Sequence, residues 1–253
     1  MIRSVIITGA SSGIGAALAR LYAKPGRSLA LTGRDGPRLE AVAADCRALG
    51  AEVESQLIDV ADRGPMTAWI TERDAVVPTD LVIANAGISG GTGGSAGGET
   101  EEQTRRLFAT NLGGVHNTVL PLIEPMRRRG RGQIALMASL AAYRGFASAP
   151  AYCATKAAVK VWGEGLRPWL AEDGVKVSVI CPGFVESRIT DANSFPMPLL
   201  MPADKAARII ARGLERNRPR IAFPWPMVAL VQLTALLPPA LLEPLMRRLP
   251  KKG

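Results

Sequence analysis

The feature that most constrains the fold is a glycine-rich turn between an apolar strand pattern and a helical pattern near the N-terminus. The strand pattern Val5–Thr8 is followed by Gly9-Ala10-Ser11-Ser12-Gly13-Ile14-Gly15. Glycine lets the backbone turn tightly and approach a pyrophosphate, and the helix N-terminus behind it presents free N–H groups to the phosphates. The spacing G-x-x-x-G-x-G alone is a weak signal, but its strand–turn–helix context favours a phosphate loop over an ordinary βα turn.

Apolar runs alternate with longer helical patterns along the rest of the chain. The alternation predicts βαβ units and a parallel sheet with helices on both faces, as a single α/β domain over residues 1–253. The predicted strands are Val5–Thr8, Leu29–Thr32, Glu52–Ile58, Leu81–Ala84, Gln133–Met137, Val175–Ile180 and Arg220–Phe223. The predicted helices are Ile14–Ala23, Gly36–Leu49, Asp62–Arg73, Glu101–Arg128, Ala151–Glu172 and Ala203–Asn217.

Cysteine and histidine usage limits the chemistry and the compartment. Cys46, Cys153 and Cys181 are odd in number and form no CxxC pair, so we expect a reduced, cytoplasmic chain. The N-terminal residues run directly into a strand pattern, so we expect no signal peptide. The lone His116 lies in an apolar-periodic stretch and is expected to be structural, and we predict no metal site.

The chain is basic, with a formal net charge of +9 and a pI near 10.0. Such a charge favours an anionic partner, which could be a phosphorylated cofactor, an acidic carrier protein, anionic lipid or nucleic acid. The run Arg127–Arg131 carries no interleaved aromatic residues, so base stacking is not supported and we predict a solvated loop rather than a nucleic-acid site.

Several short motifs follow one another along the chain. They are the loop Thr8–Gly15, then Asn85-Ala86-Gly87, Asn111, Ser139, the Y-x-x-x-K segment Tyr152–Lys156, and Pro182-Gly183. In this order they resemble one family, the short-chain dehydrogenases/reductases. The resemblance covers roughly residues 4–190 and implies a seven-stranded, doubly wound, Rossmann-like sheet in the order 3-2-1-4-5-6-7.

The resemblance implies a nicotinamide cofactor and assigns residues to it. An acid after the second strand binds the ribose of NAD, whereas an arginine there accommodates the 2′-phosphate of NADP. Gly33 takes the acid position and Arg34 follows it, so we predict NADP(H) over NAD(H), although Asp35 comes next. The implied cofactor contacts are Gly9, Ser11, Ser12, Gly13, Ile14, Gly15, Arg34, Asp59, Val60, Asn85, Ala86, Gly87, Tyr152, Lys156, Pro182 and Gly183.

The family resemblance also implies a catalytic set of Asn111, Ser139, Tyr152 and Lys156. An unperturbed tyrosine has a pKa near 10, and a neighbouring ammonium would lower it. Tyr152 and Lys156 are four residues apart and share a helix face. We therefore expect Lys156 to depress the pKa of Tyr152, Ser139 to hold the substrate oxygen, and Asn111 to complete a proton relay through ordered water.

Three segments are expected to set substrate specificity: Ile88–Gly98, Leu140–Pro150 and Phe184–Pro202. The last is either an apolar lid over residues 184–202, which suggests an apolar substrate, or a segment packed against the body or a partner subunit. Residues 224–253 form an apolar and basic extension. We favour a helix that covers the pocket or an oligomer interface over one that lies on an anionic membrane surface.

The sequence thus predicts an oxidoreductase that transfers a hydride between NADP(H) and a carbonyl or alcohol, with Tyr152 as acid/base. Two alternatives stay open, a 3-oxoacyl-thioester reductase and a non-catalytic nucleotide-binding interaction protein. The expected partners are a small-molecule substrate and further copies of the chain, as a homodimer or homotetramer. A peripheral membrane contact through the tail is the alternative for residues 224–253.

Overall fold

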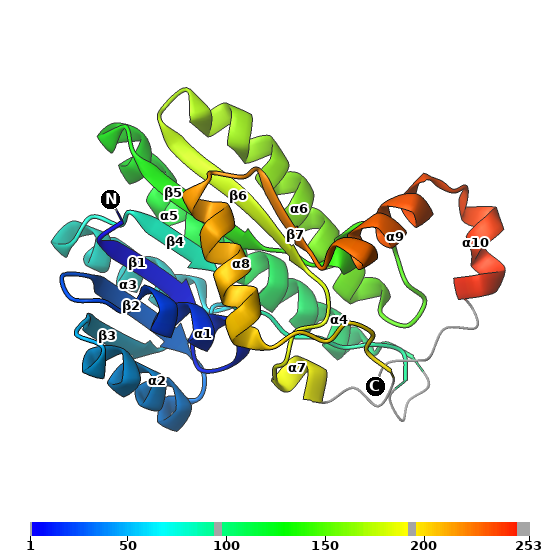
Figure 1. Cartoon of the computed structure of the whole chain (residues 1–253), viewed down its shortest axis with the longest axis horizontal. Coiled ribbons are helices and arrows are strands. Elements are labelled where there is room, and N and C mark those ends of the chain that lie inside the picture. The colour runs from blue at the N-terminus through cyan, green and yellow to red at the C-terminus, as the bar shows by residue number, and fades with distance from the viewer. Residues whose placement is uncertain (1, 94–97, 192–195, 247–253) are drawn as a thin grey trace.

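The computed structural model describes residues 2–93, 98–191 and 196–246. Its centre is a seven-stranded sheet in the order β3-β2-β1-β4-β5-β6-β7, with every neighbouring pair parallel (Figure 1). This confirms the predicted doubly wound fold and its strand order. The strands are β1 (Ser4–Thr8), β2 (Ser28–Gly33), β3 (Glu52–Leu57), β4 (Leu81–Ala84), β5 (Gly132–Met137), β6 (Val175–Pro182) and β7 (Arg220–Phe223).

Helices cover both faces of the sheet, and each face has its own apolar core. Leu18, Val42 and Ile210 represent the core under α1, α2 and α8. Met66, Leu122 and Leu166 represent the core under α3, α5 and α6. The helices of the two layers are α1 (Gly13–Tyr22), α2 (Gly36–Ala48), α3 (Arg63–Val76), α4 (Glu101–Phe108), α5 (Gly114–Arg129), α6 (Pro150–Ala171) and α8 (Ala203–Glu215).

The central strands are buried and mostly apolar because both of their faces are covered. All five residues of β1 are buried, whereas exposed and half-buried residues alternate along much of the edge strand β3. The chain runs outward from β1 through β2 to β3 and then returns to β4 on the other side of β1. At such a switch point the loops after the strands diverge and leave a crevice at the carboxyl ends of the strands.

The long helix predicted over Glu101–Arg128 is divided in the structure. A π-helical turn at Ala109–Gly113 separates α4 from α5. Gly113 and Gly114 follow each other here, and glycine has low helix propensity. A Cβ on Gly114 would also collide with the Val60 side chain, so this glycine lets the helix approach the loop after β3. The wider turn contains Asn111.

The C-terminal extension forms two further helices, α9 (Trp225–Leu236) and α10 (Pro239–Met246), which project from one side of the body (Figure 1). The Arg144 guanidinium holds the end of α9, since its Nη1 donates to the carbonyl oxygens of Thr234 and Leu237, both at 2.8 Å. Within the part of the chain that the structure describes, no helix is long and apolar enough to span a bilayer.

Candidate active site

A crevice of about 1060 Å³ lies at the carboxyl ends of the strands. It brings together almost every residue predicted from the motifs, although these are spread from Gly9 to Gly183. Two predicted residues do not line it: Gly15 and Asn111, of which Asn111 is fully buried behind its wall. The predicted residues that line it are Gly9, Ser11, Ser12, Gly13, Ile14, Arg34, Asp59, Val60, Asn85, Ala86, Gly87, Ser139, Tyr152, Lys156, Pro182 and Gly183.

The loop between β1 and α1 has the backbone geometry that a phosphate cradle needs. Gly9 and Gly13 have positive φ angles, +66° and +52°. A Cβ on Gly9 would lie 2.8 Å from the Ala86 Cα atom. Among the described residues, the Ser12 side chain does not cap the first turn of α1. The N-terminus of α1 therefore faces the crevice with N–H groups available to an anion, so the loop fits a dinucleotide pyrophosphate.

Asn85 ties the loop after β4 to the phosphate loop. Its side-chain Nδ2 donates to the carbonyl oxygens of Thr8 at 2.9 Å and Gly9 at 3.2 Å. The Thr8 hydroxyl in turn accepts from the backbone N–H groups of Asn85 and Ala86, both at 3.1 Å. Asn85 thus fixes the position of Gly9 from the neighbouring strand.

A cluster of charged side chains lies where β2 ends. Arg34 Nη1 is 3.2 Å from Asp59 Oδ2, and both residues line the crevice. Asp35 caps α2 and accepts from Arg38 Nε at 2.7 Å, while Arg188 approaches it to 4.0 Å. The hydrogen bond from Arg38 holds the pKa of the Asp35 carboxyl below its ordinary value. The negative charge of Asp35 is therefore offset by these two cations.

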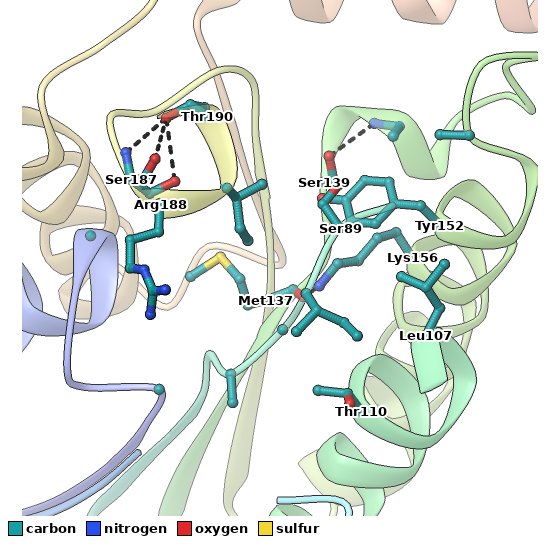
Figure 2. Close-up of a pocket in the computed structure, with 18 of the residues that line it drawn as sticks. Ser89, Leu107, Thr110, Met137, Ser139, Tyr152, Lys156, Ser187, Arg188 and Thr190 are labelled. Atoms are coloured by element: carbon teal, nitrogen blue, oxygen red, sulfur yellow. Dashed lines mark hydrogen bonds between the residues drawn. The ribbon is translucent and has the colours of Figure 1, made fainter. Parts of the chain in front are cut away.

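Tyr152 and Ser139 meet at the other end of the crevice (Figure 2). Ser139 follows β5, Tyr152 lies in the first turns of α6, and their side chains are hydrogen-bonded. Burial raises the pKa of Tyr152 above its ordinary value, and the hydrogen bond with Ser139 opposes that rise. The Ser139 Oγ also accepts from the backbone N–H of Ala141 at 3.1 Å, which orients the hydroxyl.

The expected depression of the Tyr152 pKa by Lys156 is wrong for this structure. The Lys156 Nζ atom lies 5.9 Å from the centre of the Tyr152 ring and donates to the carbonyl oxygen of Met137 at 2.9 Å. Desolvation dominates both groups: it raises the pKa of Tyr152 and lowers the pKa of Lys156 to about 8. The i, i+4 spacing does place both side chains in the same crevice, as Figure 2 shows.

Asn111 lies in the π-helical turn and uses its amide within the protein. Its Oδ1 accepts from the Ile88 N–H at 2.8 Å, and its Nδ2 donates to the Ile88 carbonyl at 3.0 Å. The same Nδ2 lies 3.2 Å from the Thr155 hydroxyl, which donates to the carbonyl oxygen of Tyr152 at 2.8 Å. Asn111 thereby links the loop after β4 to the turn of α6 that carries Tyr152.

Comparison with known proteins decides the family. The family model described as short chain dehydrogenase matches residues 3–195. An uncharacterised oxidoreductase of Myxococcus xanthus is 36% identical over 98% of this chain and 97% of its own length. The chain belongs to the short-chain dehydrogenases.

Two further relatives agree with this family assignment, one by its fold and one by its sequence. A short-chain dehydrogenase of Sphingobium yanoikuyae, solved in complex with NADPH, superposes with a TM-score of 0.82 at 26% identity over 100% of this chain and 98% of that one. A ketoacyl reductase of Nostoc is 32% identical over 72% of this chain and 63% of its own length. The chain is thus a short-chain dehydrogenase oxidoreductase with a nucleotide-binding Rossmann-like fold.

Apolar side chains line one part of the crevice, and they come from the segments expected to set specificity and from α9, in the extension predicted to cover the pocket or an oligomer interface. Phe146 and Ile189 line it, as do Met227 and Val231 of α9. The two ends of segment 184–202 pair with each other, because Val185 and Met201 form a β-bridge, and both residues are buried. The short helix α7 (Arg188–Asp191) lies between them, and Phe195 falls outside the described residues.

Four features of this short-chain dehydrogenase site were missed from the sequence. The Met137 carbonyl that holds Lys156 carries no side-chain signal. The Thr8 hydroxyl was quoted in the loop motif without a role. Thr190 organises α7, since its Oγ1 accepts from the Ser187 N–H at 2.8 Å, and both residues line the crevice. Arg188 could have been noted as a cation within the predicted lid, but only the fold brings it to Asp35.

Proposed function

We propose that this short-chain dehydrogenase transfers a hydride between NADP(H) and an alcohol or carbonyl substrate, with Tyr152 as the acid/base. One observation carries the proposal: the Tyr152 phenol, hydrogen-bonded with Ser139, lies in the same crevice as a loop shaped for a pyrophosphate. A protein that only senses a nucleotide has no need of a proton donor there, which argues against the non-catalytic alternative.

The bound nicotinamide would supply the hydride, and the protein supplies position and protons. In the reducing direction the Tyr152 phenol donates its proton to the developing alkoxide, and the raised pKa of Tyr152 keeps the phenol protonated at neutral pH. The Ser139 hydroxyl orients the substrate oxygen beside that phenol. The Lys156 ammonium, held by the Met137 carbonyl in the same crevice, would bind the ribose of the nicotinamide. Asn111 acts as a positioning residue through Ile88 and Thr155.

Preference for NADP(H) over NAD(H) rests on the cations after β2. Arg34 is half-exposed at the crevice, and within the described residues its one ion pair is with Asp59 at 3.2 Å, so it has further N–H groups that can bind a 2′-phosphate. The acid beside it, Asp35, is already paired with Arg38. The NADPH complex of the Sphingobium relative supports the same choice. The cofactor would be held by the predicted set from Gly9 to Gly183.

The substrate we propose is apolar, because Phe146, Ile189, Met227 and Val231 line its end of the crevice. A 3-oxoacyl thioester is the second candidate, and the name of the Nostoc ketoacyl reductase is the observation that favours it. In that case a pantetheine-linked substrate would react faster than the free ketone of the same chain length.

We also propose a cytoplasmic homo-oligomer that assembles through α5 and α6. These helices pack side by side, since His116 and Trp162 contact edge-to-face with their ring centres 4.6 Å apart. Leu120, one turn beyond His116, and Val161 are exposed apolar side chains on the two helices. The three cysteines, which are free and buried in the structure, suit a reducing compartment. Light scattering of Val161→Asp, compared with the wild type, tests the assembly.

The proposed function is tested by following NADPH oxidation at 340 nm against a panel of ketones, aldehydes and acyl thioesters. We expect turnover with at least one apolar carbonyl compound, a higher kcat/KM with NADPH than with NADH, and loss of turnover in Tyr152→Phe. If Tyr152→Phe turned over as fast as the wild type, Tyr152 would not be the acid/base. Turnover confined to thioesters would select the second candidate.

A further inference from the structure

The C-terminal helix α9 has one apolar side that lines the crevice and another that is exposed to solvent. Its inner side carries Met227 and Val231, which line the active-site crevice, and Val231 is buried. Its outer side carries Leu230, Leu233 and Leu236, which recur every three residues and are exposed. A surface helix is ordinarily apolar on one side and polar on the other. This one carries no charged residue, and its polar residues are only Gln232 and Thr234.

The exposed apolar surface extends beyond these leucines to both ends of the arm formed by α9 and α10. Trp225, at the first position of α9, is exposed, and so is Leu241 on α10. The arm projects from the body of the molecule, so its outer surface is not covered by the sheet or its helices (Figure 1). Exposed apolar side chains gathered on one projecting arm are typical of an interaction site.

The charged residues that follow the arm in the sequence indicate which kind of partner binds its exposed apolar side chains. Directly after α10 the sequence carries four cations, Arg247, Arg248, Lys251 and Lys252, with Glu243 as the only acid in residues 224–253. An apolar helix followed by cations provides the two contributions that stable attachment to an anionic bilayer requires. A twofold interface between two copies would bring these like charges of both chains to the same patch. Lipid is therefore the better match than a second copy.

We propose that the outer side of α9 and α10 docks on an anionic lipid surface and that the substrate is a carbonyl or alcohol compound dissolved in that lipid. The second part rests on the proposed function. An α-helix with its side chains is about 10 Å thick, so lipid on the outer side of α9 would lie about that far from the pocket wall at Met227 and Val231. A hydrophobic substrate would then pass from the bilayer into the crevice with little exposure to water.

The arm variant is Leu233→Ser/Leu236→Ser, whose side chains are 60% and 82% exposed. Its matched control is Leu57→Ser/Val76→Ser, at 59% and 77% exposed on β3 and α3, away from the arm. Because all four positions are exposed, both variants are expected to keep the wild-type melting temperature. Both are compared with the full-length wild type and with Lys251→Gln/Lys252→Gln.

Binding is measured by co-sedimentation with vesicles of phosphatidylcholine alone or mixed with phosphatidylglycerol, without cofactor or substrate. We expect the wild type and the control to sediment with the anionic vesicles, the arm variant to bind about tenfold or more weakly for each leucine lost, and the lysine variant to bind less. A wild type that stays in the supernatant with anionic vesicles overturns the proposal. So does an arm variant that binds normally, or one whose only change is a smaller oligomer in light scattering.

The substrate class is tested with a chain-length series of 2-alkanones presented in the same vesicles. Wild-type and control rates should rise with chain length, whereas the arm variant should keep its rate on the short, water-soluble ketones and lose the gain on the long ones. A chain-length dependence that is the same in the arm variant overturns delivery through the lipid. Vesicle binding needs no turnover, so failure of the reductase assay and failure of docking are separate results.

Discussion

The buried ammonium group of Lys156 donates a hydrogen bond to the carbonyl oxygen of Met137, with 2.9 Å between Nζ and O. This contact joins α6 to the last residue of β5 at the floor of the crevice. It fixes the position of the ammonium but does not compensate its desolvation, and burial lowers the pKa of Lys156 to about 8. The charge that the mechanism requires is therefore lost only slightly above neutral pH.

The first prediction is a pH dependence. The pKa of Lys156 lies below its ordinary value, so the group gives up its proton as the pH rises through about 8. We expect kcat/KM for NADPH in carbonyl reduction to fall above that pH, because this ratio reports the groups of the free enzyme. Lys156→Arg stays protonated and should move the fall to higher pH even if its rate is lower. A profile that is flat to pH 10 would contradict the role of the ammonium.

The second prediction concerns the proton donor. Tyr152→Phe removes only the phenol oxygen, so we expect kcat to fall by about 10²–10⁴-fold, the range for loss of a general acid, while the Kd of NADPH stays near that of the wild type. Stopped-flow turnover and fluorescence titration with NADPH measure the two effects. Tyr143→Phe is the matched control, since Tyr143 is also a half-buried tyrosine but does not line the crevice.

Much of this site could be predicted from the sequence because its parts are local motifs. The positive φ angles of Gly9 and Gly13 and the spacing of Tyr152 and Lys156 leave direct marks in the residue types. The π-helical turn around Asn111 left no such mark, because the helical pattern continues through it and the turn depends on the contact of Gly114 with the Val60 loop.

The electrostatics could not be predicted either. Sequence spacing places Lys156 beside Tyr152 but says nothing of how deeply the two are buried, and burial decides the direction of both pKa shifts. In the same way, residues 224–253 were recognised as an apolar and basic extension, yet only the fold shows that Met227 and Val231 line the crevice while Leu233 and Leu236 are exposed.

The third prediction tests cofactor choice. Arg34→Ala should weaken NADPH binding by about ten- to a hundredfold, as expected for loss of a charge-assisted hydrogen bond, and leave NADH binding almost unchanged. Isothermal titration with both cofactors measures this. Arg105→Ala serves as the control, because Arg105 is exposed and paired with Glu101 away from the crevice. Equal losses for the two cofactors would show that Arg34 does not contact the 2′-phosphate.

The fourth prediction separates backbone strain from a steric clash at the phosphate loop. Gly9 and Gly26 both have positive φ angles, +66° and +73°, which cost a non-glycine residue about 1–2 kcal/mol. A Cβ on Gly9 would lie 2.8 Å from Ala86 Cα, whereas the space around Gly26, as far as the described residues show, is open to 4 Å. Gly9→Ala should therefore lower the melting temperature more than Gly26→Ala, and only Gly9→Ala should lose NADPH binding.

The fifth prediction concerns α9 as a wall of the pocket. Met227 lines the crevice and packs against the apolar core of the α6 side, whereas Leu230, three residues on, is 60% exposed. Met227→Ala removes apolar contact from a bound substrate, and a methylene in such a pocket discriminates by about 10–200-fold. We expect kcat/KM to fall about tenfold or more for long-chain ketones and to change little for acetone-sized ones.

Leu230→Ala is the control for that change, because the Leu230 side chain lies on the same helix but is exposed and does not line the crevice. With a water-soluble ketone series and no lipid present, Leu230→Ala should match the wild type at every chain length. If both variants lose the same activity, α9 acts only as a structural support for β7 and the crevice wall. If Met227→Ala alone loses activity, and only on the longer ketones, then α9 contacts the distal part of the substrate and the C-terminal extension takes part in substrate selection.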